Sequence, residues 1–377
     1  MTDLRPPTSD LDPAARDILE RFGLGDDELG HFRARLAAGE ATAASNRIRG
    51  LVQPPGDDDV VPLAPVGSAE RARLAAIGDQ AIARGEVGAV VLAGGMATRF
   101  GGVVKAVVEA LPGHSFLDLK LRDVARAAER ARGRVPVWLM TSFATDAEIT
   151  ALARTRSTER VPVETFAQFA ALRLTPDGSV FREDDGTASP YAPGHGDLTF
   201  ALRRRGVLSQ FRAVGGRVLF MSNVDNLAAT LDPAVVGAHL DGGAGITVEV
   251  AAKEPGDKGG APARVDGKPQ IVESFRFPEG FDEDAIPVFN TNTLVLDAAA
   301  IDRDFPLTFF AVKKKVERRD AIQFERLVGE LTAFLPTRFL RVERDGADGR
   351  FQPAKDPDEL AKRRPSLELL LRARGVL

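Results

Sequence analysis

Short apolar runs alternate with longer amphipathic stretches along most of the chain from Val87 onward. The runs are rich in aliphatic residues and too short for ordinary helices, as buried strands are. They cover residues 88–95, 135–142, 161–166 and 217–226. Residues 116–133 and 145–155, which lie between them, have apolar positions at helical spacing. This alternation predicts an α/β fold with a Rossmann-like, mostly parallel mixed sheet covered by helices on both faces.

The second half of the chain continues this pattern and adds hairpins. Residues 246–254, 263–277 and 287–297 predict further strands, with Asp266 and Gly267 as a hairpin turn. A second hairpin is expected within residues 172–184, around Asp177 and Gly178. Helical spacing predicts one helix over residues 198–216, ended by Gly215, and another over residues 321–335.

The first 85 residues predict a helical segment. Asp12 followed by Pro13 is a favourable helix start, and Ser68 precedes a helical stretch that Gly85 can end. The Pro- and Asp-rich residues 53–67 predict a surface loop. The expected organisation is an N-terminal helical segment (1–85), a large α/β domain (86–335) and a short C-terminal segment (336–377).

Composition excludes several kinds of protein. The chain has 377 residues with 50 basic and 54 acidic side chains, so its net charge of -4 gives no broad attraction to nucleic acid or to an anionic membrane. The absence of cysteine excludes disulfides and thiolate metal sites. We expect a cytoplasmic protein, because the start does not resemble a leader and no run of about 18 apolar residues occurs.

Residues 92–105 contain the first candidate site. Gly94 and Gly95 follow a predicted buried strand, where the absence of a Cβ lets the backbone approach a phosphate or a base closely. Arg99 and Lys105 supply cations of the kind that bind triphosphate oxygens. The glycine spacing is neither that of a Walker A loop nor that of the dinucleotide fingerprint. A tight turn without a ligand is the alternative interpretation.

Two further motifs place polar groups on loops. His195 lies between Gly194 and Gly196, which favours ligand contact over a purely structural role without implying general-base chemistry. Asp225 follows an apolar strand and is a suitable Mg²⁺ ligand, because Mg²⁺ prefers one or two carboxylates with phosphate oxygens and water. An Asx turn with Asn226 is the alternative.

Asparagines and lysines near the C-terminal end complete the candidates. Asn290 and Asn292 are expected on one side of a strand, where they could bind sugar hydroxyls or merely satisfy buried backbone. The run Lys313–Lys315 is more often a solvated surface than a site. The sequence RFQPAK, which ends at Lys355, is the last candidate motif.

The ordered set GGxxTRxG, LMTSFATD, TFAQF, PGHGD, MSNVDNL, FNTNTL and QPAK resembles the eukaryotic-type UDP-sugar pyrophosphorylases, from about Val87 to Leu360. That family includes the UDP-glucose and UDP-N-acetylglucosamine enzymes. The resemblance implies a nucleotide-diphospho-sugar transferase fold. It also implies a reaction in which UTP and a sugar 1-phosphate form a UDP-sugar and pyrophosphate, with Mg²⁺ as cofactor.

The resemblance also implies roles for residues at the matching positions. Gln168 would read uracil, Gly194 would lie beside the base, and Lys355 would stabilise charge on the α-phosphate. The expected catalytic residues are Lys355, Lys105 and Arg99. The expected UTP-binding residues are Ala93, Gly94, Gly95, Lys105, Gln168, Gly194 and Asp225, the last of which is also the metal ligand. The expected sugar-phosphate-binding residues are His195, Asn223, Asn290, Asn292 and Lys313.

This sequence departs from the family pattern in three ways. Ala97 stands where the family usually has glycine, and Val104 where proline commonly precedes the lysine. If Ala97 had to take a positive φ, the loop would be strained and UTP affinity could suffer. Only 22 residues follow Lys355, too few for the C-terminal β-helix of many relatives, so we do not expect oligomerisation through that element.

The sequence leaves more than one possibility for the sugar substrate and for the class of reaction. PGHGD, LMTSFATD and SNVDNL resemble the glucose 1-phosphate enzymes, whereas AVKKK with QFERLV resembles the N-acetylglucosamine 1-phosphate enzymes. We favour glucose because the motifs nearest the substrate, including His195, fall on that side. A glycosyltransferase is less well supported, since Asp225 lacks a paired acid. A non-catalytic UDP-sugar-binding protein would not need Lys105, Asp225 and Lys355 together.

Overall fold

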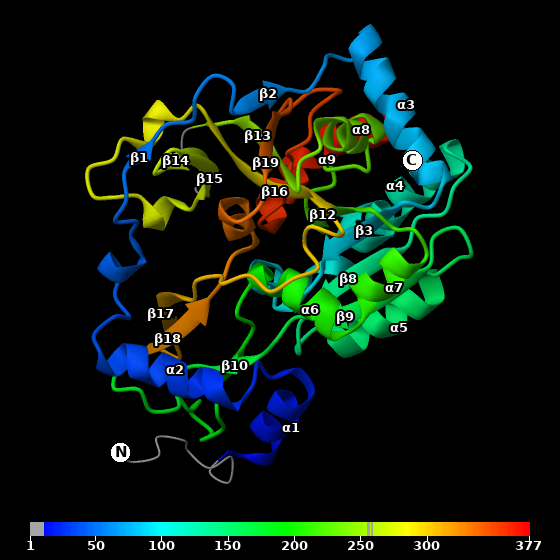
Figure 1. Cartoon of the computed structure of the whole chain (residues 1–377). Helices are drawn as coiled ribbons and strands as arrows, with labels where there is room; N and C mark the ends of the chain where they lie inside the picture. The colour runs from blue at the N-terminus through cyan, green and yellow to red at the C-terminus, as the bar shows by residue number, and fades with distance from the viewer. Residues whose placement is uncertain (1–10, 255–256, 258) are drawn as a thin grey trace.

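The computed structural model describes residues 11–254, 257 and 259–377. Its centre is an eight-stranded sheet in the order β2-β19-β13-β16-β12-β3-β8-β9 (Figure 1). In sheet order the strands are β2 (Val60–Pro62), β19 (Thr337–Arg341), β13 (Ile246–Ala252), β16 (Val288–Asp297), β12 (Val218–Asn223), β3 (Val87–Leu92), β8 (Val137–Thr141) and β9 (Val163–Ala167). Only β16 runs antiparallel to its neighbours within this sheet. The predicted mostly parallel mixed sheet is therefore confirmed.

Helices cover both faces of the sheet, as the alternating pattern predicted (Figure 1). On β3, Ala89 and Val91 pack toward one face and Val90 toward the other, because successive side chains of a strand point in opposite directions. The first face carries α3 (Ala69–Ala83), α4 (Phe116–Arg130), α5 (Asp146–Arg156), α8 (Pro233–Gly242) and α9 (Pro357–Ala373). The second face carries α6 (Leu198–Arg204) and α7 (Val207–Ala213).

The two predicted N-terminal helix starts are confirmed. The Asp12 carboxylate accepts a hydrogen bond from the backbone N–H of Ala15, and Pro13 is the first residue of α1 (Pro13–Phe22). The Ser68 hydroxyl likewise accepts from the N–H of Arg71 at the start of α3. Each side chain satisfies a backbone donor that the first helical turn leaves without a partner.

The N-terminal segment is not only helical, and residues 53–67 are not only a loop. Val52 and Gln53 form β1, which pairs with β14 (Ala261–Val265), and β2 forms an edge of the central sheet beside β19. The three segments predicted from sequence therefore contribute strands to shared sheets. Sequence pattern missed β1 and β2 because each is only two or three residues long and borders prolines.

Two helix predictions need correction. The stretch 198–216 forms two helices, α6 and α7, because Gly206 takes a left-handed conformation between them (φ 71°). Residues 321–335 do not form a helix: they begin in β18 (Arg319–Glu325), which pairs with β17 (Phe310–Val316), and continue as a 3₁₀ helix (Val328–Ala333). All four residues from Ala321 to Phe324 are buried, so they lack the alternation by which a half-exposed strand is recognised.

The predicted hairpin turn at Asp266 and Gly267 is confirmed. Both residues have positive φ, of 49° and 83°, between β14 and β15 (Lys268–Val272), as a two-residue turn of this kind requires. At the other predicted turn Gly178 also has a positive φ, and Leu174 bridges Val180. Of the helices in the described part of the chain, none combines the length and the apolar character needed to cross a membrane.

Candidate active site

A cleft of about 270 Å³ lies where the parallel strands end. The carboxyl ends of parallel strands are the usual place for ligands in such sheets. Eight of the fourteen predicted site residues line it, and Ala93 is buried directly beside it. The complete lining is Leu92, Gly94, Gly95, Lys105, Met140, Gln168, Ala192, Gly194, His195, Asn223, Val224 and Asp225.

Residues 93–105, the glycine loop, form one wall of the cleft. A Cβ on Gly94 would lie 2.6 Å from Gln168 Nε2 and 3.1 Å from the backbone nitrogen of Ser142. Nothing lies within 4 Å of the corresponding position on Gly95. Gly94 thus packs closely against the Gln168 side chain and the backbone that follows β8, whereas Gly95 leaves open space.

The glycine loop contains no strain at Ala97. This residue has a φ of −81°, and the left-handed conformations fall instead on Gly101 and Gly102 (φ 88° and 79°). The loss of UTP affinity expected from a strained Ala97 therefore has no basis in the backbone. Arg99 lies in the exposed turn of this loop, outside the lining of the cleft.

Lys105 and Asp225 form an ion pair inside the cleft, with 2.5 Å between Nζ and Oδ2. Lys105 ends the glycine loop, and Asp225 belongs to residues 223–231, the Asp225 loop, which leads from β12 toward α8. Both side chains are largely buried, with 19% and 13% of their surfaces exposed. The pair places one cation and one carboxylate where a metal-bound phosphate group would need both.

The donor set at Asp225 fits a Mg²⁺ ion that brings its other ligands with it. Within the described ranges 11–254, 257 and 259–377, no group of three or more His, Cys, Asp or Glu could hold a metal ion alone. A single carboxylate at the wall of an open cleft is nevertheless the usual protein share of a Mg²⁺ site that phosphate oxygens and water complete.

His195 is held as a neutral imidazole. Its Nδ1 accepts a hydrogen bond of 3.0 Å from the backbone N–H of Val328, and burial lowers its pKa to about 4. Because Nδ1 is an acceptor, the proton of the neutral ring is on Nε2. His195 can therefore donate to a ligand oxygen at neutral pH, but it is not placed to change its charge there.

The glycines that flank His195 serve packing against the protein. A Cβ on Gly194 would lie 2.8 Å from the carbonyl oxygen of Arg326, and one on Gly196 would lie 2.5 Å from its carbonyl carbon. We expected these glycines to let the backbone approach a ligand closely, but in the structure they approach the backbone of Arg326 instead. Sequence analysis did not single out Arg326, whose buried guanidinium pairs with Asp197 at 2.5 Å and fixes the loop from behind.

The asparagines converge on the same edge by a different geometry from the one predicted. Because β16 is antiparallel, its beginning lies beside the end of β12. A bulge in β16 and a left-handed Asn292 (φ 57°) break the regular alternation that would place Asn290 and Asn292 on one side. Asn292 Nδ2 instead donates to Asn223 Oδ1 at 2.9 Å, while Asn290 Oδ1 accepts from the N–H of Asn292.

The segment that precedes Lys355 is tied to the Asp225 loop by Asn226, whereas Lys355 itself does not line the cleft. The Asn226 amide donates to the carbonyl of Arg350 (3.1 Å) and accepts from the N–H of Gln352 (3.0 Å), and Asn226 bridges Pro353. Lys355 itself is exposed, just before α9. Asn226 therefore does more than close an Asx turn, because it joins the Asp225 loop to residues 350–353. In the sequence, only its position next to Asp225 pointed to a role in the site.

Lys313 lies apart from the cleft lining, exposed on β17. The neighbouring Lys314 and Lys315 pair with Glu325 and Asp320 on β18. These contacts agree with the solvated surface that a run of lysines usually forms.

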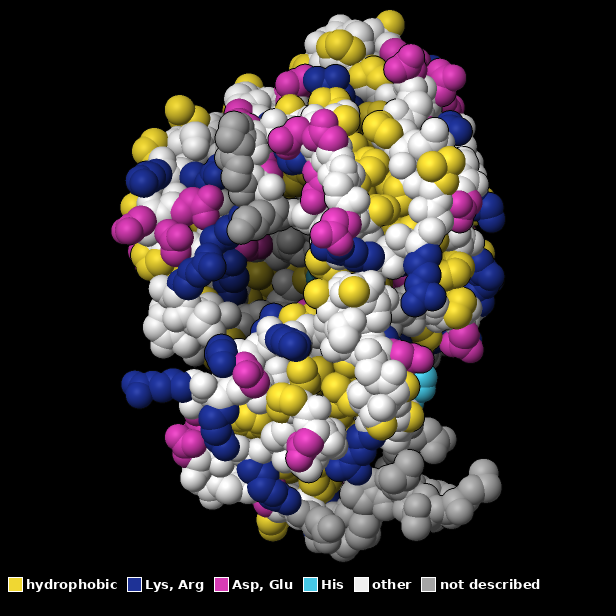
Figure 2. Space-filling view, turned by 90° about the vertical axis from the view of Figure 1, so that its left-hand side faces the viewer, with side chains coloured by type: hydrophobic (Ala, Val, Ile, Leu, Met, Phe, Trp, Pro, Cys, Tyr) yellow, Lys and Arg dark blue, Asp and Glu magenta, His cyan; other side chains and the backbone are white. Residues whose placement is uncertain are grey.

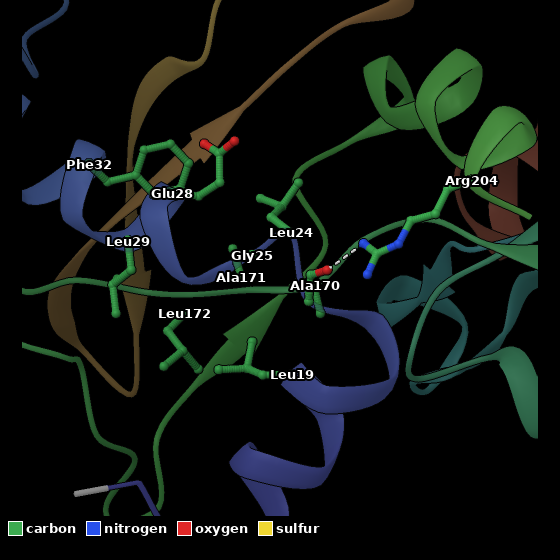
Figure 3. Close-up of a pocket in the computed structure, with 11 residues that line it drawn as sticks. Leu19, Leu24, Gly25, Glu28, Leu29, Phe32, Ala170, Ala171, Leu172 and Arg204 are labelled. Carbon is green, nitrogen blue, oxygen red and sulfur yellow. Dashed lines mark hydrogen bonds between the residues drawn. The ribbon is translucent and has the colours of Figure 1, made fainter. Parts of the chain in front are cut away.

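A second cavity, of about 140 Å³, lies between the N-terminal helices and residues 170–172, which follow Gln168 closely in the chain (Figure 3). Figure 3 shows apolar side chains of α1, α2 (Asp26–Ala37) and β10 (Ala171–Leu172) around it, with Arg204 at one end. Arg204 donates to the carbonyl of Gly23, and the N–H of Ala170 donates to the carbonyl of Phe22. The N-terminal helices thus hold the segment that follows Gln168, and none of the predicted site residues lines this cavity.

Comparison with known proteins finds relatives over most of the chain. The family model for UTP–glucose-1-phosphate uridylyltransferase matches residues 46–370. The enzyme of that name from Saccharomyces cerevisiae is 34% identical over 222 residues, which cover 56% of this chain and 44% of the relative. UTP–glucose-1-phosphate uridylyltransferase 2 from Dictyostelium discoideum is 30% identical over 286 residues, 71% of this chain and 56% of the relative. The chain spans about half the length of these curated relatives.

Solved structures show the same fold. A Trypanosoma brucei UDP-N-acetylglucosamine pyrophosphorylase aligns with a TM-score of 0.76 and 22% identity, covering 93% of this chain and 79% of that one. A UDP-glucose phosphorylase from the same organism aligns with a TM-score of 0.72 and 22% identity, covering 94% and 79%. Because the family model matches most of its length, the chain belongs to the UTP–glucose-1-phosphate uridylyltransferase family.

Proposed function

We propose that this chain joins UTP and glucose 1-phosphate into UDP-glucose and releases pyrophosphate. The observation that carries the proposal is the Lys105–Asp225 pair, which lies in one cleft with Gly94, Gln168 and His195. Each group in the cleft suits one part of the substrates. The cation suits the UTP phosphates and the carboxylate suits a metal ion. The amide suits the uracil base, and the neutral imidazole suits the sugar phosphate. The matched relatives carry the name of this activity.

The proposed reaction is one in-line displacement. A phosphate oxygen of glucose 1-phosphate attacks the α-phosphorus of UTP and forms a new O–P bond. The bond from that phosphorus to the oxygen shared with the β-phosphate breaks, and this oxygen leaves with pyrophosphate. The attacking group is already an anion, so no general base is needed, in agreement with a His195 whose pKa of about 4 keeps it neutral. Positioning and charge neutralisation are then the main tasks of the protein.

Gln168 is proposed to select the base. Its amide lies beside Gly94, so the close packing of these two residues would leave a flat slot for a ring. An amide presents one acceptor and one donor, which match the N3–H and O4 of uracil. Cytosine reverses both groups at these positions, so it would be accepted only if the amide turned by 180°.

Lys105 and Asp225 are proposed to bind the triphosphate together, Lys105 directly and Asp225 through Mg²⁺. Asp225 would hold Mg²⁺, which when bound supplies charge neutralisation on the phosphates. The Lys105 ammonium, 2.5 Å from Asp225 in the free chain, would then turn to the phosphate oxygens. Lys355 follows the segment that Asn226 holds through its bridge to Pro353, and it is proposed to reach the transferred phosphorus and stabilise charge there when the substrates bind.

The sugar phosphate is proposed to bind on the side of His195 and the asparagines. His195 Nε2 can donate to a phosphate oxygen, and Asn223 and Asn292 present amide groups at the cleft edge. Seen from the left-hand side of Figure 1, the molecule is hollowed near its middle, and both basic and acidic side chains lie at the rim (Figure 2). A cytoplasmic location stays a prediction.

Pyrophosphate release by the purified chain tests the proposal. The assay contains UTP and Mg²⁺ with glucose 1-phosphate, N-acetylglucosamine 1-phosphate or galactose 1-phosphate in parallel. We expect the highest kcat/KM with glucose 1-phosphate. A preference for N-acetylglucosamine 1-phosphate would replace the proposed sugar. UTP binding without release from any sugar would favour a non-catalytic binding protein instead.

A further inference from the structure

We infer that Lys120, Arg350 and Arg374 are positioning residues for the proposed uridylyl transfer, because together they hold the Asp225 loop in place. The inference rests on the proposed function in one respect, the role of Asp225. Its structural basis is independent of that function. Of the three, sequence analysis included only Arg350, as the first residue of the RFQPAK motif and without a role of its own.

Three successive carbonyls of the Asp225 loop each accept a hydrogen bond from a different cation. Arg374 donates to the carbonyl of Ala228 at 2.7 Å, Lys120 to that of Ala229 at 2.8 Å, and Arg350 to that of Thr230 at 2.9 Å. The donors come from three separate parts of the chain: α4, the segment after β19, and the C-terminal end of α9.

These cations satisfy backbone that has no regular secondary structure. Ala228, Ala229 and Thr230 are at most 5% exposed and lie outside the helices and strands of the structure. A buried carbonyl without a partner costs about 1–3 kcal/mol, and hydrogen bonds from charged donors are stronger than neutral ones. Each cation therefore fixes a peptide group that would otherwise favour a more solvated conformation of the loop.

The burial of so much positive charge is balanced locally. Arg350, which is 1% exposed, pairs with the fully buried Glu249 at 2.6 Å. Asp123, on the same helix as Lys120, accepts from the N–H of Leu231 at 2.7 Å. Carboxylates thus neutralise the cations, and one of them also fixes the end of the loop.

The contacts extend to both sides of Asp225. Lys120 also donates to Ser222 Oγ at 3.0 Å, so one ammonium joins the end of β12 to the carbonyl of Ala229. The backbone of Arg350 accepts from the Asn226 amide while its side chain binds Thr230. Asp225 lies between these fixed points, and movement of the loop would move its carboxylate relative to Lys105.

The test compares the full chain with Lys120→Met, which removes the donor and keeps an unbranched side chain of similar length. The first readout is hydrogen exchange of residues 224–231 without ligand. The second is the Mg²⁺ concentration that gives half-maximal pyrophosphate release. We expect faster exchange and an increase in that concentration of about tenfold, the usual effect of losing a residue that orients a metal ligand. Lys120→Arg should restore part of both values.

Arg276→Met is the matched control. It also removes a largely buried cation, but one that pairs with Glu330 outside the cleft lining. It should lower stability without changing the Mg²⁺ dependence. If Lys120→Met does not fold, Arg374→Met removes the more exposed member of the group and is measured in the same way.

The two readouts separate the possible failures. Unchanged exchange in the loop, or a change in Mg²⁺ dependence no larger than that of Arg276→Met, would overturn the inference. Faster exchange together with a wild-type chain that releases no pyrophosphate would contradict the proposed function, while the holding of the loop would stand.

Discussion

The two loops that meet at the Lys105–Asp225 pair are held in opposite ways. From Asn226 to Leu231 every residue of the Asp225 loop is buried, and cations and carboxylates bind its backbone. Most of the glycine loop from Gly95 to Val103 is exposed, and a Cβ placed on Gly95, Gly101 or Gly102 would meet nothing within 4 Å.

This difference suggests separate tasks in binding one substrate. A loop fixed before binding loses little conformational entropy when the ligand arrives, so it is suited to hold a metal ligand in position. A loop with few contacts can close over a nucleotide and open again for product release. Lys105 and Asp225 would couple the two, because their ion pair must rearrange when phosphate groups enter.

The largest effect is expected at Lys355, an exposed residue that follows Pro353, the bridge partner of Asn226 in the Asp225 loop. Lys355→Ala should lower kcat by about 10²–10³, the usual cost of removing one donor to developing charge, while the affinity for UTP changes little. Steady-state kinetics and UTP titration measure the two quantities. Lys362→Ala, an exposed lysine on α9, is the control and should retain wild-type values. Equal loss of turnover and UTP binding would remove Lys355 from the transition state.

Gln168 should control the choice of nucleotide. Gln168→Ala should lower the preference for UTP over CTP, as a ratio of kcat/KM values, by about tenfold, because one or two neutral hydrogen bonds to the base are lost. Competition between the two nucleotides in one reaction gives this ratio directly. Unchanged selectivity would mean that the amide does not contact the base.

The adjacent glycines Gly94 and Gly95 offer a matched pair within the glycine loop. A Cβ on Gly94 would displace the end of the Gln168 side chain, so Gly94→Ala should raise the KM for UTP about three- to fivefold and weaken base selectivity. Gly95→Ala meets no protein atom and should leave selectivity and folding stability unchanged. Similar selectivity in both variants would show that the Gly94–Gln168 contact is not used in base recognition.

The smallest effect concerns pH. His239, in α8 behind the Asp225 loop, is 2% exposed, and burial lowers its pKa to about 4. The unfolded chain binds a proton here near pH 6.5 and the folded chain does not, so the free energy of unfolding falls as the pH drops. The expected loss is about 0.7 kcal/mol between pH 7 and 6. Denaturant unfolding of His239→Gln should show a smaller loss; an equal one would contradict the assignment.

Local signals predicted much of this fold from sequence. Asp12 with Pro13, Ser68, and Asp266 with Gly267 act on their own neighbours in the chain, and the structure confirms each one. The β17–β18 hairpin carries no such signal, because Glu317 and Arg318 take the positive φ values that a tight turn usually assigns to Asn or Gly. Residues 321–325 were therefore predicted as helix.

The candidate site was predictable where one motif supplies one wall of the cleft. Gly94, Gln168 and Asp225 follow the parallel strands β3, β9 and β12 of the central sheet, so they meet at one edge of it. Lys105 and His195 line the same cleft from loops outside that sheet. Contacts between distant segments gave no sequence pattern. The direction of β16 and the donors to residues 228–230 depend on the tertiary structure alone.

Hydrogen exchange of the two loops, with and without UTP and Mg²⁺, tests most directly whether one substrate binds between a fixed loop and an adaptable one. We expect residues 224–231 to be protected in the free chain and little changed by ligand. Residues 95–103 should exchange fast in the free chain and gain protection when UTP binds. Fast exchange of both loops in the free chain, or no change in residues 95–103 at saturating UTP, would contradict this account.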